Sequence, residues 1–274
     1  MQERAVNLEA IGPVHALGEG LFVGGNGELS MVDISRKKIF CGRDRQLSVT
    51  CDFVPTAIIG AEGPFLDVVT DRGRVRWDAR TMTSSWVNAW RGHIHGGADF
   101  RSNDAVMSSC GRLLVGFMSR NDPTHDAGYI YMQERDGELK LLADDIFIPN
   151  TFIEIEPNIF LISDSSKSVV HRFEFDSAGK VVSRTVFTEY SSDVAPDGGC
   201  MVGNEVFIAL WGGSAISVLS LSGTEKARIP VPVTYPTNVK WDQSANVLWC
   251  TSASEPGEPF SPSGYDGRLL KLEI

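Results

Sequence analysis

Short apolar runs that alternate with polar residues dominate the chain, and Gly, Asn and Asp interrupt them at short intervals. No window shows a sustained helical period with a cap at each end. This pattern is typical of an all-β protein built from short strands. In its clearest stretch, three polar turns separate four such segments: Pro149–Ile155, Ile159–Ser163, Val169–Phe175 and Val181–Thr188.

One segment type, an alternating apolar run that follows a turn, recurs six times. Its copies are Met31–Ile34, Gly73–Trp77, Gly128–Met132, Val169–Phe175, Ala215–Leu221 and Gly267–Ile274, and their first residues lie 42, 55, 41, 46 and 52 residues apart. A unit of about 40 to 50 residues with four short strands is the size of a propeller blade. We therefore predict that residues 1–274 form one domain, a six-bladed β-propeller with four antiparallel strands per blade. A sandwich of two sheets is the alternative that periodicity leaves open.

The last repeat ends at Ile274 and lacks an outer strand. We expect Arg4–Ala10 to provide it, because joining the two ends of the chain in one blade closes the ring and removes an open sheet edge.

Six polar positions recur in phase with the predicted blades. The first strand of each blade lines the axis of a propeller, and the residues near the start of these strands are Glu19, Thr56, Asn103, Asn150, Asp197 and Asn238. Two are carboxylates and none is basic, so gathering them opposes like charges by about 4 kcal/mol at ~4 Å and an effective dielectric of ~20. A divalent cation would neutralise that charge, and carboxylate and amide oxygens suit Ca²⁺, Mg²⁺ or Mn²⁺ better than a structural Zn²⁺. Turn capping by the Asn and Asp side chains is the alternative.

Charge and composition exclude several other functions. The chain has 35 acidic and 25 basic residues, a net charge of -10, and no basic run longer than Arg36–Lys38, so nucleic acid is a poor partner. No Gly-x-Ser-x-Gly elbow or phosphate loop is present, which argues against serine-hydrolase and nucleotide chemistry.

No apolar run has the length of a signal peptide or a membrane span, and the five cysteines form no Cys-x-x-Cys pair. We expect a cytoplasmic protein with no membrane partner, and the oligomeric state stays open.

A set of short motifs resembles a known family. In order along the chain they are Gly18-Glu19-Gly20, Met31-Val32-Asp33-Ile34, Arg101-Ser102-Asn103-Asp104, Gly111-Arg112 leading to Gly116-Phe117-Met118, Ile148-Pro149-Asn150, Ser163-Asp164-Ser165, Pro196-Asp197-Gly198 and Thr251-Ser252-Ala253. Their order and spacing are similar to those of the family of senescence marker protein, gluconolactonase and luciferin-regenerating enzyme. The resemblance covers nearly the whole chain.

This resemblance implies a metal-dependent hydrolase that opens a small-molecule sugar lactone to the aldonic acid. One divalent cation, Ca²⁺ first and Mn²⁺, Mg²⁺, Zn²⁺ or Fe²⁺ as alternatives, would polarise the lactone carbonyl and activate water. Glu19, Asn150 and Asp197 match the family's metal ligands, and Asp197 is the candidate catalytic proton acceptor. Arg101 and Asn103 match its substrate-contacting pair, and they lie on one face of a strand.

The chain departs from the family pattern in the substrate half. Gly18-Glu19-Gly20-Leu21-Phe22-Val23 replaces Gly-Glu-Gly-Pro-x-Trp, Ala105 stands where Gly follows Asn-Asp, and Ser119-Arg120-Asn121 stands where some members have an acidic substrate contact. The identity of the lactone is therefore open. An organophosphate-type hydrolase on the same metal site and a non-catalytic, metal-stabilised binding propeller are the alternative functions.

Three other features receive structural interpretations. The pair His93 and His95 is interpreted as part of a polar loop rather than a metal site. Asp99, Asp104 and Asp164 are expected to form turns or to orient ligands. The tryptophans lack a basic stripe and are expected to pack between blades: Trp77, Trp86, Trp90, Trp211, Trp241 and Trp249.

Overall fold

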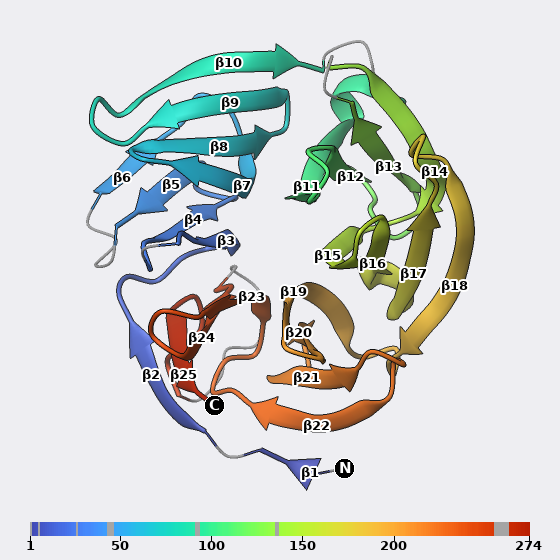
Figure 1. Cartoon of the computed structure of the whole chain (residues 1–274). Coiled ribbons are helices and arrows are strands. Elements are labelled where there is room, and N and C mark those ends of the chain that lie inside the picture. The colour runs from blue at the N-terminus through green and yellow to red at the C-terminus, as the bar shows by residue number, and fades with distance from the viewer. Residues whose placement is uncertain are drawn as a thin grey trace.

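Six sheets surround a central axis in the computed structural model, which describes residues 2–4, 6–25, 27–42, 47–90, 94–134, 137–254 and 263–274 (Figure 1). Each sheet has four antiparallel strands, and one gains a short fifth strand from the N-terminal segment. The predicted six-bladed β-propeller is thus confirmed, and the sandwich is excluded. None of the helices in these ranges has the length and apolar character needed to cross a membrane.

Every blade runs from an innermost strand at the axis to an outermost strand at the rim. From the axis outward, blade 1 has β3 (Gly18–Val23), β4 (Leu29–Asp33), β5 (Lys38–Cys41) and β6 (Leu47–Thr50). Blade 2 has β7 (Pro55–Glu62), β8 (Phe65–Thr70), β9 (Gly73–Asp78) and β10 (Thr83–Ala89). Blade 3 has β11 (Phe100–Met107), β12 (Leu113–Ser119), β13 (Gly128–Gln133) and β14 (Leu139–Ile146).

Blade 4 has β15 (Pro149–Glu156), β16 (Ile159–Asp164), β17 (Val169–Phe175) and β18 (Val181–Glu189). Blade 5 has β19 (Ala195–Val202), β20 (Glu205–Trp211), β21 (Ala215–Ser220) and β22 (Glu225–Pro230). Blade 6 has β23 (Pro236–Asp242), β24 (Val247–Ser252), β25 (Leu269–Glu273) and β2 (Asn7–Ile11). Two short 3-10 helices, η1 (Gly97–Asp99) and η2 (Ser165–Lys167), precede β11 and follow β16.

Five of the six repeated segments fall on the third strand of a blade, and the first does not. Met31–Ile34 overlaps β4, the second strand of blade 1, whereas the third strand is β5. β4 is buried along its whole length and therefore carries the stronger apolar signal, while β5 is short and begins with Lys38. The predicted phase is wrong by one strand in this blade.

The N-terminal strand closes the ring as predicted. β2 pairs antiparallel with β25, and Leu8 and Ala10 pack against the core shared by blades 5 and 6. Arg4 lies outside this strand, because its backbone amide donates instead to the carbonyl of Arg228 at 3.0 Å. Just before it, β1 (Gln2–Glu3) runs parallel to β22, so the first residues connect blade 5 to blade 6 (Figure 1).

Apolar side chains between neighbouring blades form the core. Trp77 packs with residues of blades 1 and 2, and Trp90 with residues of blades 2 and 3. The interblade position predicted for the tryptophans is correct for these two, and also for Trp241 between blades 5 and 6 and Trp249 between blades 6 and 1. It is wrong for Trp86, which lies on the outer strand β10 and is 48% exposed.

Aspartates at the end of the second strand hold the chain that leads into the innermost strand. The carboxylate of Asp33 accepts hydrogen bonds from the backbone amides of Ala16 at 2.9 Å and Leu17 at 3.3 Å, just before β3. Asp164 accepts from the two amides before β15 at 3.0 and 3.2 Å. This confirms a turn role for Asp164 and fixes where the innermost strands begin.

Candidate functional site

All six innermost strands, β3, β7, β11, β15, β19 and β23, change register near their first residues. The irregularities lie between Glu19 and Phe22, Pro55 and Ala57, Ser102 and Ala105, Asn150 and Ile153, Pro196 and Gly199, and Pro236 and Val239. Each predicted axial residue lies in or beside one of them. A bulge changes the direction in which a side chain points. Six bulges at the same level therefore redirect six polar side chains at one end of the axis. We call this end, where the innermost strands begin, the mouth.

Glu19 and Asp197 bring two carboxyl groups together from blades 1 and 5. Both side chains are buried, with exposed fractions of 9% and 6%, and their carboxyl groups hydrogen bond to each other. Burial, and then the negative charge of Asp104, raises the pKa of Glu19 to about 8. Burial, and then the charges of Glu19 and Asp104, raises the pKa of Asp197 well above its ordinary value. Without a cation, the pair therefore holds protons that exposed carboxyls would lose.

Two asparagines from other blades complete the polar set. Asn150 is anchored through its amide nitrogen, which donates to the hydroxyl of Ser165 at 3.2 Å. Asn238 donates a hydrogen bond to Glu19, which offsets part of the rise in the Glu19 pKa. The structure thus brings three of these four residues into direct contact, and Asn238, an axial position in the sequence pattern, joins the predicted ligand residues.

Two oxygens of this set have no hydrogen-bond partner within the described ranges. They are Oδ1 of Asp197 and Oδ1 of Asn238, and both are buried. A buried acceptor without a partner is destabilising by about 1–3 kcal/mol. A hard cation bound between the blades would satisfy both oxygens and replace the protons on the carboxyl pair.

The donor set therefore fits a divalent cation on chemical grounds. The set mixes carboxylates with amides. No group of three His, Cys, Asp or Glu side chains suited to a metal occurs in the described part of the chain. Such oxygen donors are the ligands that Ca²⁺ and Mg²⁺ prefer.

Arg101 and Asn103 lie together beside the carboxyl pair. Arg101 Nη1 donates to Asn103 Oδ1 at 2.8 Å and to the carbonyl of Ser102 at 2.9 Å. Asn103 Nδ2 donates to the carbonyl of Pro149 at 3.1 Å, across to blade 4. The positive charge of Arg101 also lowers the pKa of Glu19, which places the guanidinium near the axis. Both side chains are partly exposed and so can contact a small molecule at the mouth.

Asp104 and Lys240 are site residues that the sequence interpretation misses or places elsewhere. The sequence predicts a turn or orienting role for Asp104, yet its charge acts directly on Glu19 and Asp197. Burial raises the pKa of Asp104, and the positive charge of Lys240 opposes that rise. Lys240 Nζ donates to the carbonyl of Gly199 at 2.8 Å. The spacing of Lys240, two residues after Asn238 on one strand, is the signal that could have identified it.

Two glycines allow the innermost strands to approach each other this closely. Gly20 has a φ of 56°, and a Cβ there would lie 2.9 Å from the carbonyl oxygen of Thr56. A Cβ on Gly198 would lie 2.4 Å from the side-chain amide of Asn238. Side chains at these positions would displace the axial set.

Sequence comparison decides the family. Residues 17–254 match the family described as SMP-30/Gluconolactonase/LRE-like region. The chain belongs to this family. A relative from Rhizobium meliloti (strain 1021), named "Putative sugar lactone lactonase", is 32% identical over 143 residues. That alignment covers 50% of this chain and 48% of the relative, so the chain spans about half the length of the curated relative it matches.

Solved structures share the fold of this family member. Regucalcin from Agrobacterium tumefaciens, described as a calcium-binding protein, superposes with a TM-score of 0.85 at 22% identity, over 96% of this chain and 91% of that one. A luciferin-regenerating enzyme gives a TM-score of 0.88 at 19% identity, over 98% and 96%. A gluconolactonase from Xanthomonas campestris gives 0.75 at 18% identity, over 97% and 89%. At these identities the likeness shows the fold.

A cavity of about 400 Å³ continues along the axis below the site of this family member. Asp104, Asn238 and Lys240 contribute to its walls, and Met107 and Met201 line it toward the far ends of the innermost strands. The carboxyl pair therefore lies between the mouth and a cavity whose walls are both polar and apolar.

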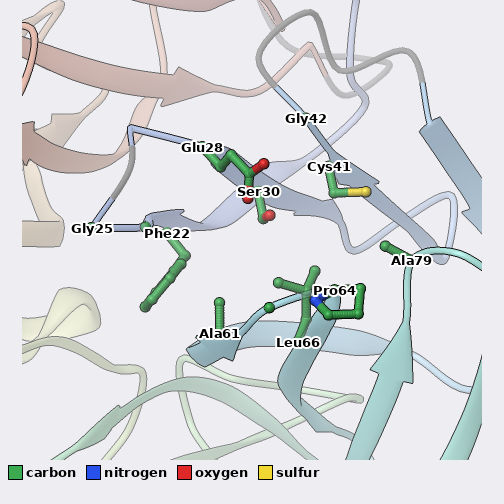
Figure 2. A pocket seen from close by; sticks show the side chains of 12 residues that line it. Phe22, Gly25, Glu28, Ser30, Cys41, Gly42, Ala61, Pro64, Leu66 and Ala79 are labelled. Carbon is green, nitrogen blue, oxygen red and sulfur yellow. The ribbon is translucent and has the colours of Figure 1, made fainter.

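A separate cavity of about 450 Å³ lies between blades 1 and 2 (Figure 2). In Figure 2, Ser30 and Cys41 lie on one side of it and Pro64 and Leu66 on the other. Its residues come from the ends of strands opposite the mouth, because Phe22 is near the end of β3 and Pro64 is in the β7–β8 turn. It is therefore not part of the axial site.

The histidine pair is only partly described by the structure. His93 lies outside the described residues. The ring of His95 hydrogen bonds to the hydroxyl of Tyr131 and stacks on Tyr129 with 5.4 Å between ring centroids. His95 therefore packs over blade 3, as the loop interpretation expects.

Proposed function

We propose that this protein is a divalent-cation-dependent hydrolase that opens a sugar lactone to the aldonic acid. The observation that carries the proposal is the buried Glu19–Asp197 carboxyl pair with the partnerless oxygens of Asp197 and Asn238 beside it. Membership of a family described by gluconolactonase, and partial identity to a relative named as a sugar lactone lactonase, support the substrate class.

Glu19, Asn150 and Asp197 would hold the cation, with Asn238 adjacent. When bound, the cation supplies Lewis-acid polarisation of the lactone carbonyl and makes a nearby water more acidic. Ca²⁺ is the first candidate because the ligands are oxygens, and Mn²⁺, Mg²⁺, Zn²⁺ and Fe²⁺ are the alternatives.

Arg101 and Asn103 would orient the substrate. The Arg101 guanidinium, which bonds to Asn103 and Ser102, would contact sugar hydroxyls or the ring oxygen. Asp197 would accept a proton from the water that attacks the carbonyl carbon. The ring C–O bond would then break, and the ring oxygen would take the proton from Asp197 and leave as the hydroxyl group of the aldonic acid.

A panel of pentono- and hexonolactones, followed with a pH indicator, tests this proposal together with elemental analysis of the purified protein. We expect Asp197→Asn to lower kcat/KM by at least about 10²-fold, since it removes both a ligand charge and the proton acceptor. Glu205→Gln is the matched control, because Glu205 is a partly exposed carboxylate paired with Lys226 on blade 5.

Four outcomes contradict the proposal. Wild-type rates in Asp197→Asn, or full activity after verified removal of metal, would exclude the mechanism. Turnover of organophosphates without lactones would assign phosphoryl chemistry to the same site. Cation-dependent stabilisation without hydrolysis of either panel would assign a binding propeller.

A further inference from the structure

A third cavity, of about 600 Å³, opens at the mouth beside the axial site. Strand register places it there: Phe100 begins β11, Arg120 follows the end of β12, and Arg72 lies in the β8–β9 turn. Lys37 reaches it from the β4–β5 turn of blade 1. The cavity therefore spans blades 1 to 3 at the end where the innermost strands begin.

Positive charge in this mouth cavity exceeds the available negative charge. Lys37, Arg72 and Arg120 line it, and Asp71 is the one carboxylate among its described lining residues. Arg120 Nη2 donates to Asp71 Oδ2 at 2.8 Å, whereas Arg72 Nε is 3.9 Å from the same oxygen. The Lys37 ammonium has no charged or hydrogen-bonded partner in the described ranges. Three cations against one anion leave two positive charges, in a chain whose net charge is -10.

Nearby groups do not remove this excess. The other oxygen of Asp71 accepts the backbone amide of Val54 at 2.9 Å, so that carboxylate is already shared. Asp99 is not among the described residues that line the cavity, and its Oδ1 accepts from the side chain of Asn121 at 3.4 Å. An anion in the cavity would meet Lys37 in its present position and would share Arg72 with the 3.9 Å contact to Asp71, and the 2.8 Å pair of Arg120 with Asp71 would stay intact.

The shape of the cavity suggests what the anion is attached to. Phe100, which is partly exposed, supplies aromatic surface, so a ligand with a ring or carbon body can pack there. Phe100 is three residues before Asn103 on β11, and an extended strand rises about 3.3 Å per residue, so this wall is within about 10 Å of the proposed substrate pair. A six-carbon lactone with an anionic group on its terminal carbon has a comparable length.

We propose that the mouth cavity binds the anionic group of a phosphorylated or carboxylated sugar lactone and so selects charged over neutral lactones. This inference rests on the proposed lactonase function for the substrate, while anion binding itself is measurable without turnover. Phosphate and carboxylate share the recognition chemistry, and Arg72 and Lys37 are the residues that provide it.

Titration with inorganic phosphate in a calorimeter tests the anion site directly. We expect saturable binding to the full-length protein, weakened at least tenfold in the double variant Lys37→Gln/Arg72→Gln. The double variant Arg76→Gln/Lys226→Gln removes the same charge at positions that do not line the cavity and should bind like the wild type. No saturable binding, or an equal loss in both double variants, would overturn the proposal.

Steady-state kinetics on neutral, phosphorylated and carboxylated hexonolactones then identify the substrate class. We expect the cavity variant to raise KM at least tenfold for the anionic lactone that fits, with kcat and the rate on neutral lactones unchanged. Equal effects on all three would overturn the selectivity. Phosphate binding in a protein that hydrolyses none of them would disprove the lactonase function and leave the anion site standing, so the two failures are distinguishable.

Discussion

At the residue scale, the axial site depends on the absence of one side chain. Gly198 packs against the amide of Asn238, where an added Cβ would lie 2.4 Å away, and Asn238 donates to Glu19. We expect Gly198→Ala to displace Asn238, to lower the free energy of unfolding by about 1–3 kcal/mol through overpacking, and to weaken Ca²⁺ binding. Denaturant unfolding and calcium titration measure the two effects.

Gly60→Ala is the matched control, since Gly60 lies on the innermost strand β7 and a Cβ there would come no closer than 3.8 Å to Asp67. It should change stability by less than about 1 kcal/mol, in either direction. Equal effects of the two substitutions would mean that Gly198 is not required for the position of Asn238.

At the scale of elements, ring closure is carried by the strand that comes first in the sequence. β2 provides the outer edge of blade 6 through five paired residues, and its Leu8 and Ala10 cover the core between blades 5 and 6. A variant lacking residues 2–11 loses these backbone hydrogen bonds and about 2–3 kcal/mol of apolar burial. We expect a lower Tm and aggregation through the exposed edge of β25 on size-exclusion chromatography.

A variant lacking only residues 2–4 is the control, because it distinguishes the loss of β2 from the effect of shortening the N-terminus. It removes β1 and the exposed contact of Arg4 with Glu205 at 3.7 Å, and should keep the wild-type Tm within a few degrees. If both truncated proteins have the same Tm and the same elution profile on size-exclusion chromatography, β2 does not stabilise the closed ring.

The same scale shows what could be predicted from sequence and what could not. The repeat predicts the propeller and the axial position of Glu19, Asn150 and Asp197, because each blade reproduces one spacing. It does not predict the bulges, because a bulge depends on how two strands pair and leaves no periodic signal. Strict alternation along a strand would place the side chains of Asn103 and Asp104 on opposite faces, so the sequence pattern does not assign Asp104 to the site. The register shift between Ser102 and Ala105 breaks that alternation.

At the scale of the whole molecule, the blades meet around negative charge that Arg101 and Lys240 compensate only in part. Glu19 and Asp197 come from blades 1 and 5 and Asp104 from blade 3, and burial raises the pKa of each. Ionising these three carboxyl groups therefore destabilises the arrangement of several blades together. A bound cation would convert this repulsion between blades into attraction, which couples stability to metal and to pH.

The sign of that coupling follows from the raised pKa. Glu19 has an ordinary pKa of 4.5 and a pKa of about 8 in the folded protein. Between these values the folded state binds more protons than the unfolded state, so stability falls as pH rises, by up to about 1.4 kcal/mol per pH unit for each such group. We expect the Tm of cation-free protein to decline from pH 5 to pH 8, and saturating Ca²⁺ to abolish the decline because the cation takes the place of the proton.

Glu19→Gln should flatten the cation-free profile, whereas Glu205→Gln should leave it unchanged. Thermal unfolding across this pH range, with chelator or with Ca²⁺, measures both profiles, and a decline that persists equally in Ca²⁺ and in Glu19→Gln would show that the axial carboxyls do not cause it.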